Sequence, residues 1–343
     1  MQAVILAAGK STRTYPLTIT GPKPLLPLGD KTLIEYTLSL LVDFIDEAII
    51  IIGYKGDMVQ AKLGNSYQGI SLIYVQQQEQ KGTGHALLAA QHAVKGRFFL
   101  VMGDDVYSKD AIEHMSAFEH AVCVKEVQNP INFGVIVEKG GILTQFIEKP
   151  KLPVSKLANT GLYVLTPLIF DHLVKVKESI RNEIELPDAI LTLSKQHQIH
   201  VFHTTTWMPI AYPWDLLAAD EMIRDKQNLI KDTASIEGTI VNSNIGDNCV
   251  IKGIVRNSII MSDSIIEEGS IVENSIIGRN VIFSGTAISA DKITIIINDK
   301  EIILKKCGCV IGDNVNANNV TIKPGCRIWP DKKISGEIDV DVQ

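Results

Sequence analysis

An isoleucine recurs at intervals of six residues in the last third of the chain. The positions are Ile245 and Ile251, followed by Ile259, Ile265, Ile271 and Ile277. Gly, Asn, Asp and Ser fill the positions between them, as in SDSIIEEGSIVENSIIGRNV. A spacing of six fits neither an α-helix nor an alternating strand. It predicts a parallel β-helix of hexapeptide repeats, in which each short side contributes one inward apolar residue. Such coils bury a core only against their neighbours, so a structural or oligomerisation role is favoured over a second active site.

The repeat is interrupted once. The segment KITIIINDKEIILKK, residues 292–306, predicts a protruding hairpin turned at Asn298–Asp299. The repeat resumes at VIGDNVNANNVTIKPGCRI, residues 310–328. We therefore expect one repeat domain with an inserted hairpin, over residues 231–343.

Residues 1–230 follow a different pattern. The apolar runs AVILAAG, EAIIIIGY, SLIYV and RFFLVMGDD predict buried strands, and TLIEYTLSLLVDF, GDMVQAKLG and GTGHALLAAQHAVK between them predict helices. This alternation indicates an α/β doubly wound sheet, whose ligands bind beyond the carboxyl ends of the strands. FGVIVEKGGILTQFIEK predicts a hairpin turned at Gly140–Gly141, and two further helices are expected within residues 182–196 and 212–230.

The composition limits the partners and the compartment. The chain has 343 residues, of which 45% are hydrophobic and 21% charged, with a formal net charge of −6. A mildly acidic chain lacks the basic stripe expected of a protein that binds nucleic acid or an anionic membrane. No apolar run approaches the roughly 20 residues of a membrane span, and MQAVILAAGK does not resemble a signal peptide. The five scattered cysteines suit a reduced cytoplasm.

The stretch LAAGKSTRTYP, residues 6–16, follows the first predicted strand. A Walker loop would need glycine where Val4 stands, and a dinucleotide fingerprint would need glycine where Ser11 stands. Gly9 nevertheless permits a ligand to approach the backbone N–H groups closely. Arg13 follows on the loop, and Lys23 lies between two prolines in PKPLLPLG. A forked cation and a point charge near one strand end favour a polyphosphate ligand.

The stretch LAAGKSTRTYPLTITGPKPLLPLGDKTLIEY resembles the N-terminal signature of the sugar-1-phosphate nucleotidylyltransferases. The similarity is closest to archaeal glucose-1-phosphate thymidylyltransferase and UDP-N-acetylglucosamine pyrophosphorylase-like members with a C-terminal left-handed β-helix. VQQQEQKGTGHALL, VMGDDVY, FIEKP and ANTGLY follow in the order of the family. The resemblance implies a Rossmann-like nucleotidyltransferase domain over residues 1–230 and extends through the repeat half.

The resemblance also implies a role for each matching residue. Nucleotide contacts fall on Leu6, Ala7, Ala8, Gly9, Gln77, Gly82 and Thr83. Sugar-phosphate contacts fall on Gly134, Glu148, Asn159 and Thr160, and catalytic positions on Arg13, Lys23 and Lys149. Asp104, at the end of a buried strand, matches the Mg²⁺-binding aspartate, which suits a hard cation beside a triphosphate. The implied reaction is in-line attack of a sugar 1-phosphate on the α-phosphorus of UTP or dTTP, with release of pyrophosphate.

Two departures from the family pattern keep alternatives open. The family places a second metal aspartate in W-x-D-x-G, but here Pro209 and Ala211 stand at those positions. Asp215 either takes the role of metal ligand or is a first-turn helix residue favoured by the helix dipole. In addition, no histidine follows His203, which disfavours an acetyltransferase of the histidine-base type in the β-helix. The alternatives are a bifunctional acetyltransferase and a catalytically weak regulatory or scaffold paralogue.

Two properties stay open in the sequence. A single methyl group separates uracil from thymine and contributes only about 1–3 kcal/mol to discrimination, so use of both UTP and dTTP is plausible. The sugar is equally undetermined between glucose 1-phosphate and N-acetylglucosamine 1-phosphate. The family resemblance suggests a homo-oligomer, with a trimer favoured.

Overall fold

The computed structural model describes residues 1–152, 154–297 and 300–343. The chain forms two compact units, and each contains two stretches of sequence. The sheet unit comprises Met1–Lys10 and Leu33–Pro209, and the stack unit comprises Ser11–Thr32 and Ile210–Gln343. A search of the described residues found no helix that combines the length and apolar character of a membrane span. The boundary predicted at residues 230 and 231 stays a prediction.

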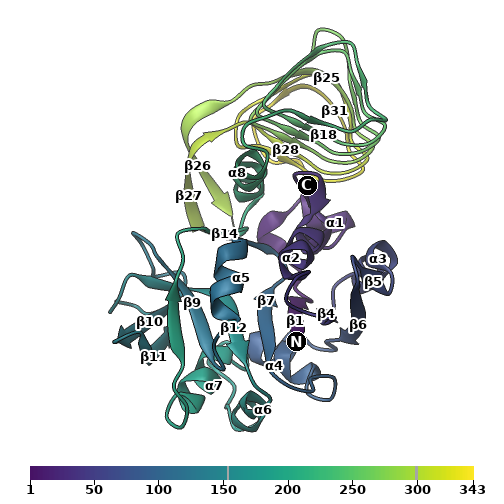
Figure 1. Ribbon diagram of the computed structural model, residues 1–343. Helices are drawn as coiled ribbons and strands as arrows, with labels where there is room; N and C mark the ends of the chain where they lie inside the picture. The colour runs from purple at the N-terminus through teal and green to yellow at the C-terminus, as the bar shows by residue number, and fades with distance from the viewer. Residues whose placement is uncertain (153, 298–299) are drawn as a thin grey trace. The chain divides into compact units, whose positions relative to one another are not determined.

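The sheet unit is built on a sheet whose described strands follow the order β10-β11-β13-β9-β12-β7-β1-β4-β6-β5 (Figure 1). Four neighbouring strands of this sheet are parallel: β7 (Phe98–Met102), β1 (Gln2–Ala7), β4 (Glu47–Ile52) and β6 (Ile70–Gln76). They contain the apolar runs of the sequence, and β1 is buried along its whole length because helices cover both faces. The predicted α/β sheet is confirmed, although β12 (Leu157–Leu165) runs antiparallel to β7 and makes the sheet mixed.

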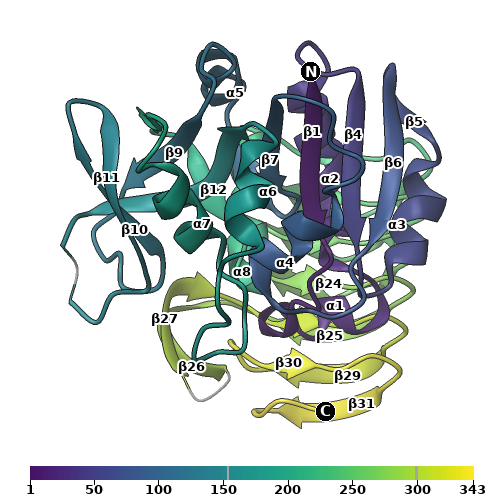
Figure 2. The same ribbon diagram turned by 90° about the horizontal axis from the view of Figure 1, so that it is seen from below.

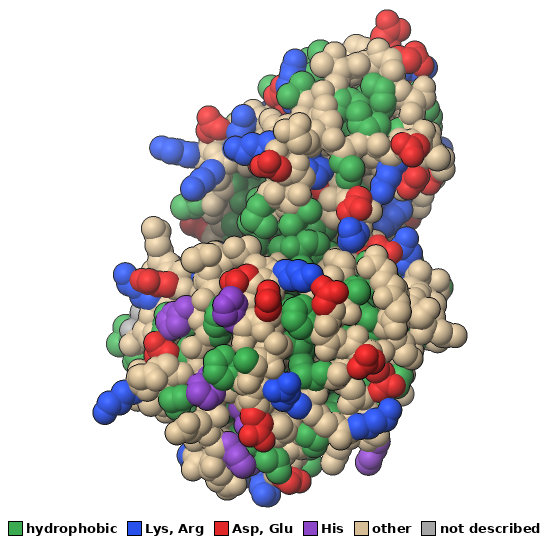
Figure 3. Space-filling view, in the orientation of Figure 1, with side chains coloured by type: hydrophobic (Ala, Val, Ile, Leu, Met, Phe, Trp, Pro, Cys, Tyr) green, Lys and Arg blue, Asp and Glu red, His purple; other side chains and the backbone are tan. Residues whose placement is uncertain are grey.

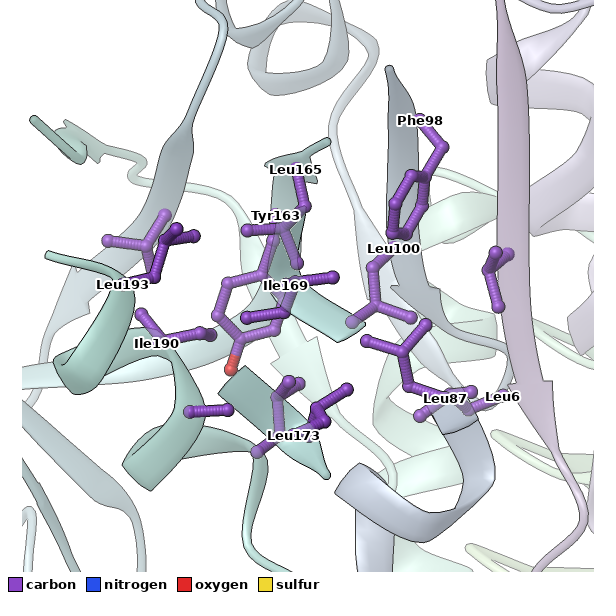
Figure 4. Close-up of a cluster of buried hydrophobic side chains, with 14 of the residues drawn as sticks. Leu6, Leu87, Phe98, Leu100, Tyr163, Leu165, Ile169, Leu173, Ile190 and Leu193 are labelled. Atoms are coloured by element: carbon purple, nitrogen blue, oxygen red, sulfur yellow. The ribbon is translucent and has the colours of Figure 1, made fainter. Parts of the chain in front are cut away.

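Helices pack their apolar faces against this sheet. In the sheet unit they are α2 (Leu33–Leu41), α3 (Gly56–Leu63), α4 (Gly82–Ala89), α5 (Lys109–Met115), α6 (Leu168–Leu173) and α7 (Leu186–Leu193). Figure 4 shows Leu87 of α4, Leu173 of α6 and Ile190 of α7 directed toward side chains of β1, β7 and β12. α7 is shorter than predicted because its sequence places Pro187 in the first turn, where proline is tolerated.

The rest of the sheet carries the predicted hairpin. β10 (Gly134–Lys139) pairs antiparallel with β11 (Ile142–Glu148), and the turn lies at Gly140 and Gly141, with φ values of +62° and +75°. Both glycines therefore occupy the left-handed region that other residues avoid. The remaining strands of the unit are β5 (Ser66–Tyr67), β8 (Asp105–Tyr107), β9 (Ala121–Glu126), β13 (His200–His203) and β14 (Trp207–Pro209).

The stack unit consists mainly of short parallel strands in superposed coils (Figure 2). The first ladder contains β15 (Leu229–Ile230), β18 (Asn244–Ile245), β21 (Ile259–Ile260), β24 (Ile276–Ile277), β28 (Val310–Ile311) and β30 (Arg327–Ile328). The second contains β16 (Ser235–Ile236), β19 (Val250–Ile251), β22 (Ile265–Ile266), β25 (Ile282–Ala287), β29 (Asn316–Ile322) and β31 (Lys333–Ile338). The third contains β17 (Thr239–Val241), β20 (Ile254–Arg256) and β23 (Ile271–Glu273) and joins β25. We call these coils the C-terminal stack.

The isoleucine repeat gives the inward residues only in part. Ile245, Ile251 and Ile277 belong to the buried core of the stack, as predicted. The prediction is wrong for Ile259, Ile265 and Ile271, because their neighbours Ile260, Ile266 and Val272 fill the core instead. Ile265 and Ile271 are only partly buried. The position of the inward residue within the six-residue repeat shifts because successive coils differ in length. Asn244 pairs with Ile259 in the next coil, and Ile259 pairs with Ile276 in the coil after it.

The first ladder of the stack is covered by the unit's own N-terminal segment. Ile259, Ile276 and Val310 stand on its outer side and yet are at most 1% exposed. The covering segment contains η1 (Thr12–Thr14), α1 (Leu17–Thr20), η2 (Lys23–Leu25), β2 (Pro27–Leu28) and β3 (Lys31–Thr32). Helix α8 (Pro213–Ile223) lies in the same unit and connects to this segment through Asp220, whose Oδ1 accepts a hydrogen bond from Gly29 N at 2.8 Å.

The predicted hairpin insertion is also present. β26 (Ala290–Ile297) pairs antiparallel with β27 (Lys300–Cys307) and extends beside the coils (Figure 2). Its predicted turn at Asn298–Asp299 lies outside the described residues. All five cysteines are buried free thiols. On the face drawn in Figure 3, basic and acidic side chains are interspersed rather than separated by sign.

Candidate functional site

The exit of β1 is fixed by hydrogen bonds to its backbone on two sides. Gly103 N donates to Leu6 O at 2.9 Å, while Ala8 O accepts from Tyr54 N at 3.1 Å and from Gln80 Nε2 at 2.8 Å. Leu6, Ala7 and Ala8 are buried, and Gly9 is the first exposed residue. The predicted nucleotide loop therefore begins at a rigid strand end.

The predicted base-reading residue Gln77 lies beside the start of α4. It is 5% exposed, and its Nε2 lies 3.4 Å from Gly82 O and 3.1 Å from His85 Nδ1. Gly82 has φ +89°, a conformation that favours glycine, and Thr83 after it is exposed. The structure therefore brings Gln77 and Gly82 together at the N-terminus of an eight-residue helix, where N–H groups favour anions.

Asp104 stands between β7 and β8, and a proline stands across from its neighbour. β8 pairs with β14, and the register places Pro209 directly opposite Asp105. Asp105 Oδ2 accepts a hydrogen bond from the indole Nε1 of Trp207 at 3.2 Å. A carboxylate at position 209 would thus stand opposite Asp105, one residue from the predicted metal ligand Asp104, and proline offers none.

Gly134 and Glu148 form one wall of the predicted sugar pocket. They face each other in the β10–β11 ladder, and a Cβ on Gly134 would lie 2.8 Å from Glu148 Oε2 and 2.8 Å from Phe146 Cε2. The same Cβ would lie 3.6 Å from Asn159 Cβ, so Asn159 belongs to this wall. Only glycine leaves this space to the carboxylate.

Thr160 serves the fold through its side chain. Its hydroxyl donates to Cys123 O at 3.0 Å, and the residue is 1% exposed. The β12–β9 pairing shifts register between Asn159 and Tyr163, with Gly161 at φ +79°. This irregularity changes the direction of the side chains in this part of β12. Asn159 Nδ2 donates a hydrogen bond to Tyr163 Oη at 2.6 Å.

Two cations flank Glu148, and sequence reasoning named only one of them. Lys149 Nζ lies 3.6 Å from Glu148 Oε1, and Lys149 itself has φ +45°. Arg181 Nη2 lies 3.5 Å from the same oxygen and donates to the buried Glu185 at 2.7 Å. The missed signal is the run RNEIE, in which Arg181 and Glu185 are four residues apart.

The other two predicted catalytic cations belong to the stack unit. Arg13 lies in η1, with its guanidinium carbon 5.9 Å from the ring centroid of Tyr212. The loop is held by the hydroxyls of Thr14 and Thr18, which donate to Ser11 O at 2.7 and 2.9 Å. Lys23 opens η2 and is 6% exposed. An ammonium group so far removed from water requires anionic or polar neighbours.

Asp215 lies near both cations and caps helix α8. Its Oδ2 accepts hydrogen bonds from Ala211 N at 2.8 Å and from Tyr212 N at 2.7 Å. Burial raises the pKa of this carboxyl above its ordinary value, against the opposing effects of the two N–H groups and the charges of Lys23 and Arg13. Asp215 is thus a first-turn residue of α8, as one of its two predicted roles has it, and its Oδ2 also caps the helix by accepting from Tyr212 N.

The described residues contain no cluster of three or more His, Cys, Asp or Glu that would hold a metal ion unaided. Asp104 and Asp215 lie in different units. A metal site at either carboxylate would therefore need oxygens that the substrate and water supply.

Comparison with known proteins identifies the family. The nucleotidyl transferase family model matches residues 2–226, and the model of the GMPPB C-terminal domain matches residues 219–342. A bifunctional protein GlmU of Methanococcus maripaludis strain C7 is 30% identical, covering 100% of this chain and 96% of the relative. For GlmU of strain S2 the match is 36% identical and spans 74% of this chain but only 62% of the relative.

Other matches cover about two thirds of this chain and nearly the whole length of the other protein. The UTP–glucose-1-phosphate uridylyltransferase AglF of Haloferax volcanii is 33% identical over 66% of this chain and 98% of its own length. A crystal structure of UDP-glucose pyrophosphorylase with UDP-glucose superposes with a TM-score of 0.61 at 25% identity, covering 66% of this chain and 99% of that one. The chain belongs to the family of sugar-1-phosphate nucleotidylyltransferases.

Proposed function

We propose that this enzyme transfers a nucleotidyl group from UTP or dTTP to a hexose 1-phosphate, with glucose 1-phosphate and N-acetylglucosamine 1-phosphate as the two sugar candidates. The observation that carries the proposal is the Glu148 carboxylate, which lies against the gap at Gly134 with Lys149 and Arg181 beside it. A carboxylate accepts hydrogen bonds from neutral hydroxyls, and cations bind a phosphate. Hydroxyls next to a phosphate are the chemistry of a sugar phosphate.

The chemistry would consist of positioning and charge neutralisation. Lys149 and Arg181 hold the sugar phosphate, and one of its oxygens attacks the α-phosphorus in line. The P–O bond to the β-phosphate breaks, and pyrophosphate leaves with that electron pair. Arg13 holds the β- and γ-phosphates and Lys23 the α-phosphate region, so the charge that develops in the transition state meets fixed cations. The backbone from Leu6 to Gly9, together with Gln77, Gly82 and Thr83, binds the nucleotide.

The carboxylates fit a hard cation. Mg²⁺ commonly takes one or two protein carboxylates and fills the rest of its octahedron with phosphate oxygens and water. Asp104 would be its ligand, and Asp215 is the second candidate through Oδ1, because two N–H groups already occupy Oδ2. Bound Mg²⁺ would screen the charge of the triphosphate.

The repeat region has a structural part in this proposal. We take it to be a left-handed parallel β-helix, supported by three parallel ladders and by Asn248, Asp263 and Asn280 at left-handed corner positions. Val250, Ile265 and Ile282 stand in register on its outer side, and Ile282 is 41% exposed. This apolar row supports a homo-oligomer through the stack, with a trimer favoured. Sedimentation equilibrium measures its mass.

Acetyl transfer is a second candidate activity, and it has less support than nucleotidyl transfer. Relatives named bifunctional GlmU keep it under consideration. Residues 204–343 contain no histidine that would serve as a general base, because His203 is the last in the chain. Acetyl-CoA consumption with glucosamine 1-phosphate tests it directly. The cytoplasmic location stays a prediction.

A substrate panel tests the proposed transfer. Pyrophosphate release is measured at millimolar Mg²⁺ with UTP, dTTP, GTP or ATP, each paired with glucose 1-phosphate or N-acetylglucosamine 1-phosphate. We expect turnover with at least one pyrimidine nucleotide and one of the sugars. Absence of turnover with every pair would leave the scaffold alternative standing.

A further inference from the structure

The segment that carries Lys23 is attached to the C-terminal stack on both sides of the lysine. Three residues before it, the hydroxyl of Thr20 donates to Asp313 Oδ2 at 2.7 Å. Two residues after it, Leu25 O accepts from Arg279 Nη2 at 3.4 Å. Asp313 and Arg279 come from adjacent coils, so the two contacts bracket Lys23 from one place on the stack.

Asp313 and Arg279 also fix each other. Arg279 N donates to Asp313 Oδ1 at 2.7 Å, and Arg279 Nη1 lies 3.4 Å from Oδ2. Asp313 is 7% exposed. A buried carboxylate whose two oxygens both accept hydrogen bonds has little freedom to move, and its loss leaves donors unsatisfied. The pair is therefore a rigid support rather than a surface contact.

A second attachment lies further along the same segment. Asn244 Nδ2 donates to Gly29 O at 3.0 Å and to Asp220 Oδ1 at 2.6 Å, and Gly29 N donates to the same Oδ1. Asp220 is fully buried and paired with Arg224 at 2.7 Å. Residues 20–30 are thus tied to the stack at both ends.

The corresponding turn at Asp247 differs from the turn at Asp313. Hydrogen bonds between coils place Asp313 and Asp247 at the same turn position, because Asp331 N donates to Asp313 O as Asp263 N donates to Asp247 O. Asp247 is exposed, and its Oδ1 accepts a hydrogen bond from the hydroxyl of Thr233 at 3.1 Å. The turn chemistry therefore recurs, while the burial and the bond to the Lys23 segment belong to Asp313.

We propose that Asp313 and Arg279 are positioning residues for nucleotidyl transfer: the C-terminal stack holds Lys23 in place through Thr20 and Leu25. This gives the repeat region a part in the reaction although it supplies no group that touches the substrate. The inference rests on the proposed role of Lys23 as a phosphate-binding cation.

Two measurements on the full-length protein test the inference separately from the function. Amide hydrogen exchange followed by mass spectrometry reports the mobility of a peptide covering residues 17–26, whether or not the enzyme turns over. Steady-state kinetics gives KM for the nucleoside triphosphate and for the sugar phosphate. The variants are Thr20→Val, which alters no residue of the C-terminal stack, Thr20→Ser, which keeps the hydroxyl, and Asp313→Ala. Asp247→Ala is the matched control.

We expect Thr20→Val and Asp313→Ala to accelerate exchange in residues 17–26 and to raise KM for the nucleotide about tenfold, the equivalent of one lost interaction. KM for the sugar phosphate should stay unchanged, and Thr20→Ser and Asp247→Ala should resemble the wild type. The effects of the two changes on the Lys23 segment should be less than additive in the double variant, because both remove the hydrogen bond between Thr20 and Asp313.

Exchange and nucleotide KM both unchanged in Thr20→Val would overturn the inference, as would faster exchange with an unchanged KM. Loss of folded enzyme alters neither KM, so it cannot imitate the expected result. A wild-type protein without turnover would defeat the proposed function, while the exchange measurement would still show whether the stack fixes the Lys23 segment.

Discussion

Pro209 stands directly opposite Asp105 in the ladder formed by β8 and β14, one residue from the predicted metal ligand Asp104. The opposing side chains of such a pair lie close together. A carboxylate at position 209 would therefore stand beside Asp105, the residue that follows Asp104 in the sequence. The departure from the family pattern at position 209, proline in place of aspartate, therefore removes a carboxylate from the strand that pairs with β8.

Pro209→Asp should lower the Mg²⁺ concentration for half-maximal activity by about tenfold, because a further carboxylate strengthens binding of a hard cation. Mg²⁺ titration of pyrophosphate release measures the change. Pro209→Asn is the control, since it makes the same backbone change without the charge. Equal Mg²⁺ dependence in both variants would show that position 209 does not face the metal.

Gly134→Ala should weaken binding of the sugar phosphate, because the added Cβ lies 2.8 Å from Glu148 Oε2 and must displace it. Overpacking of this kind costs about 1–3 kcal/mol, so KM for the sugar phosphate should rise by about tenfold or more while KM for the nucleotide holds. Gly96→Ala is the matched control, because a Cβ there meets nothing within 4 Å. If KM for the sugar phosphate were unchanged in Gly134→Ala, Glu148 would not be a residue that binds the sugar.

Arg181→Ala should raise KM for the sugar phosphate about tenfold, since it removes a cation beside Glu148. It should also cost about 1–3 kcal/mol of folding stability, because the buried Glu185 loses its cationic partner and keeps the hydroxyl of Ser179. Urea unfolding and steady-state kinetics measure the two effects.

A second variant separates the two roles of Arg181. Arg181→Ala combined with Glu185→Gln removes the buried charge, and it should recover stability without recovering the KM. Recovery of both would reduce Arg181 to a purely structural residue.

Asp215→Asn tests both the cap and the metal. Asparagine keeps an oxygen for Ala211 N and Tyr212 N, so helix α8 should be retained. Burial raises the folded-state pKa of Asp215, so its contribution to stability is greatest below the unfolded pKa of about 3.9 and is lost as pH rises through the folded value. The stability of the wild type relative to the variant should therefore fall as pH increases above 4.

Urea unfolding from pH 4 to 7 checks this sign, with Asp247→Asn as the exposed control. A relative stability that rises with pH would mean that the carboxylate is stabilised in its charged form. The Mg²⁺ titration of the same variant is independent of the cap. A higher Mg²⁺ requirement would assign Oδ1 to the metal, and an unchanged one would leave Asp215 as a cap alone.

Local pattern was sufficient to predict the strands of the α/β sheet, the hairpin at Gly140–Gly141 and the stack. Local pattern did not predict which residue of each repeat points inward, as at Ile265 and Ile266, because this depends on pairing between coils. The motif residues Gly134 and Glu148 do meet in the structure, because Gly134 begins β10 and Glu148 ends β11, its antiparallel partner. Arg181 could not be found in this way, because its contact with Glu148 joins segments 33 residues apart.

Transfer of label from the α-phosphate tests the central claim most directly. The enzyme is given UTP or dTTP carrying ³²P at the α position, with each sugar 1-phosphate in turn. We predict that the label moves into a nucleotide sugar only when sugar phosphate is present, with equimolar unlabelled pyrophosphate and no labelled protein. Label that stays in the triphosphate with every sugar phosphate at millimolar Mg²⁺ would contradict the account.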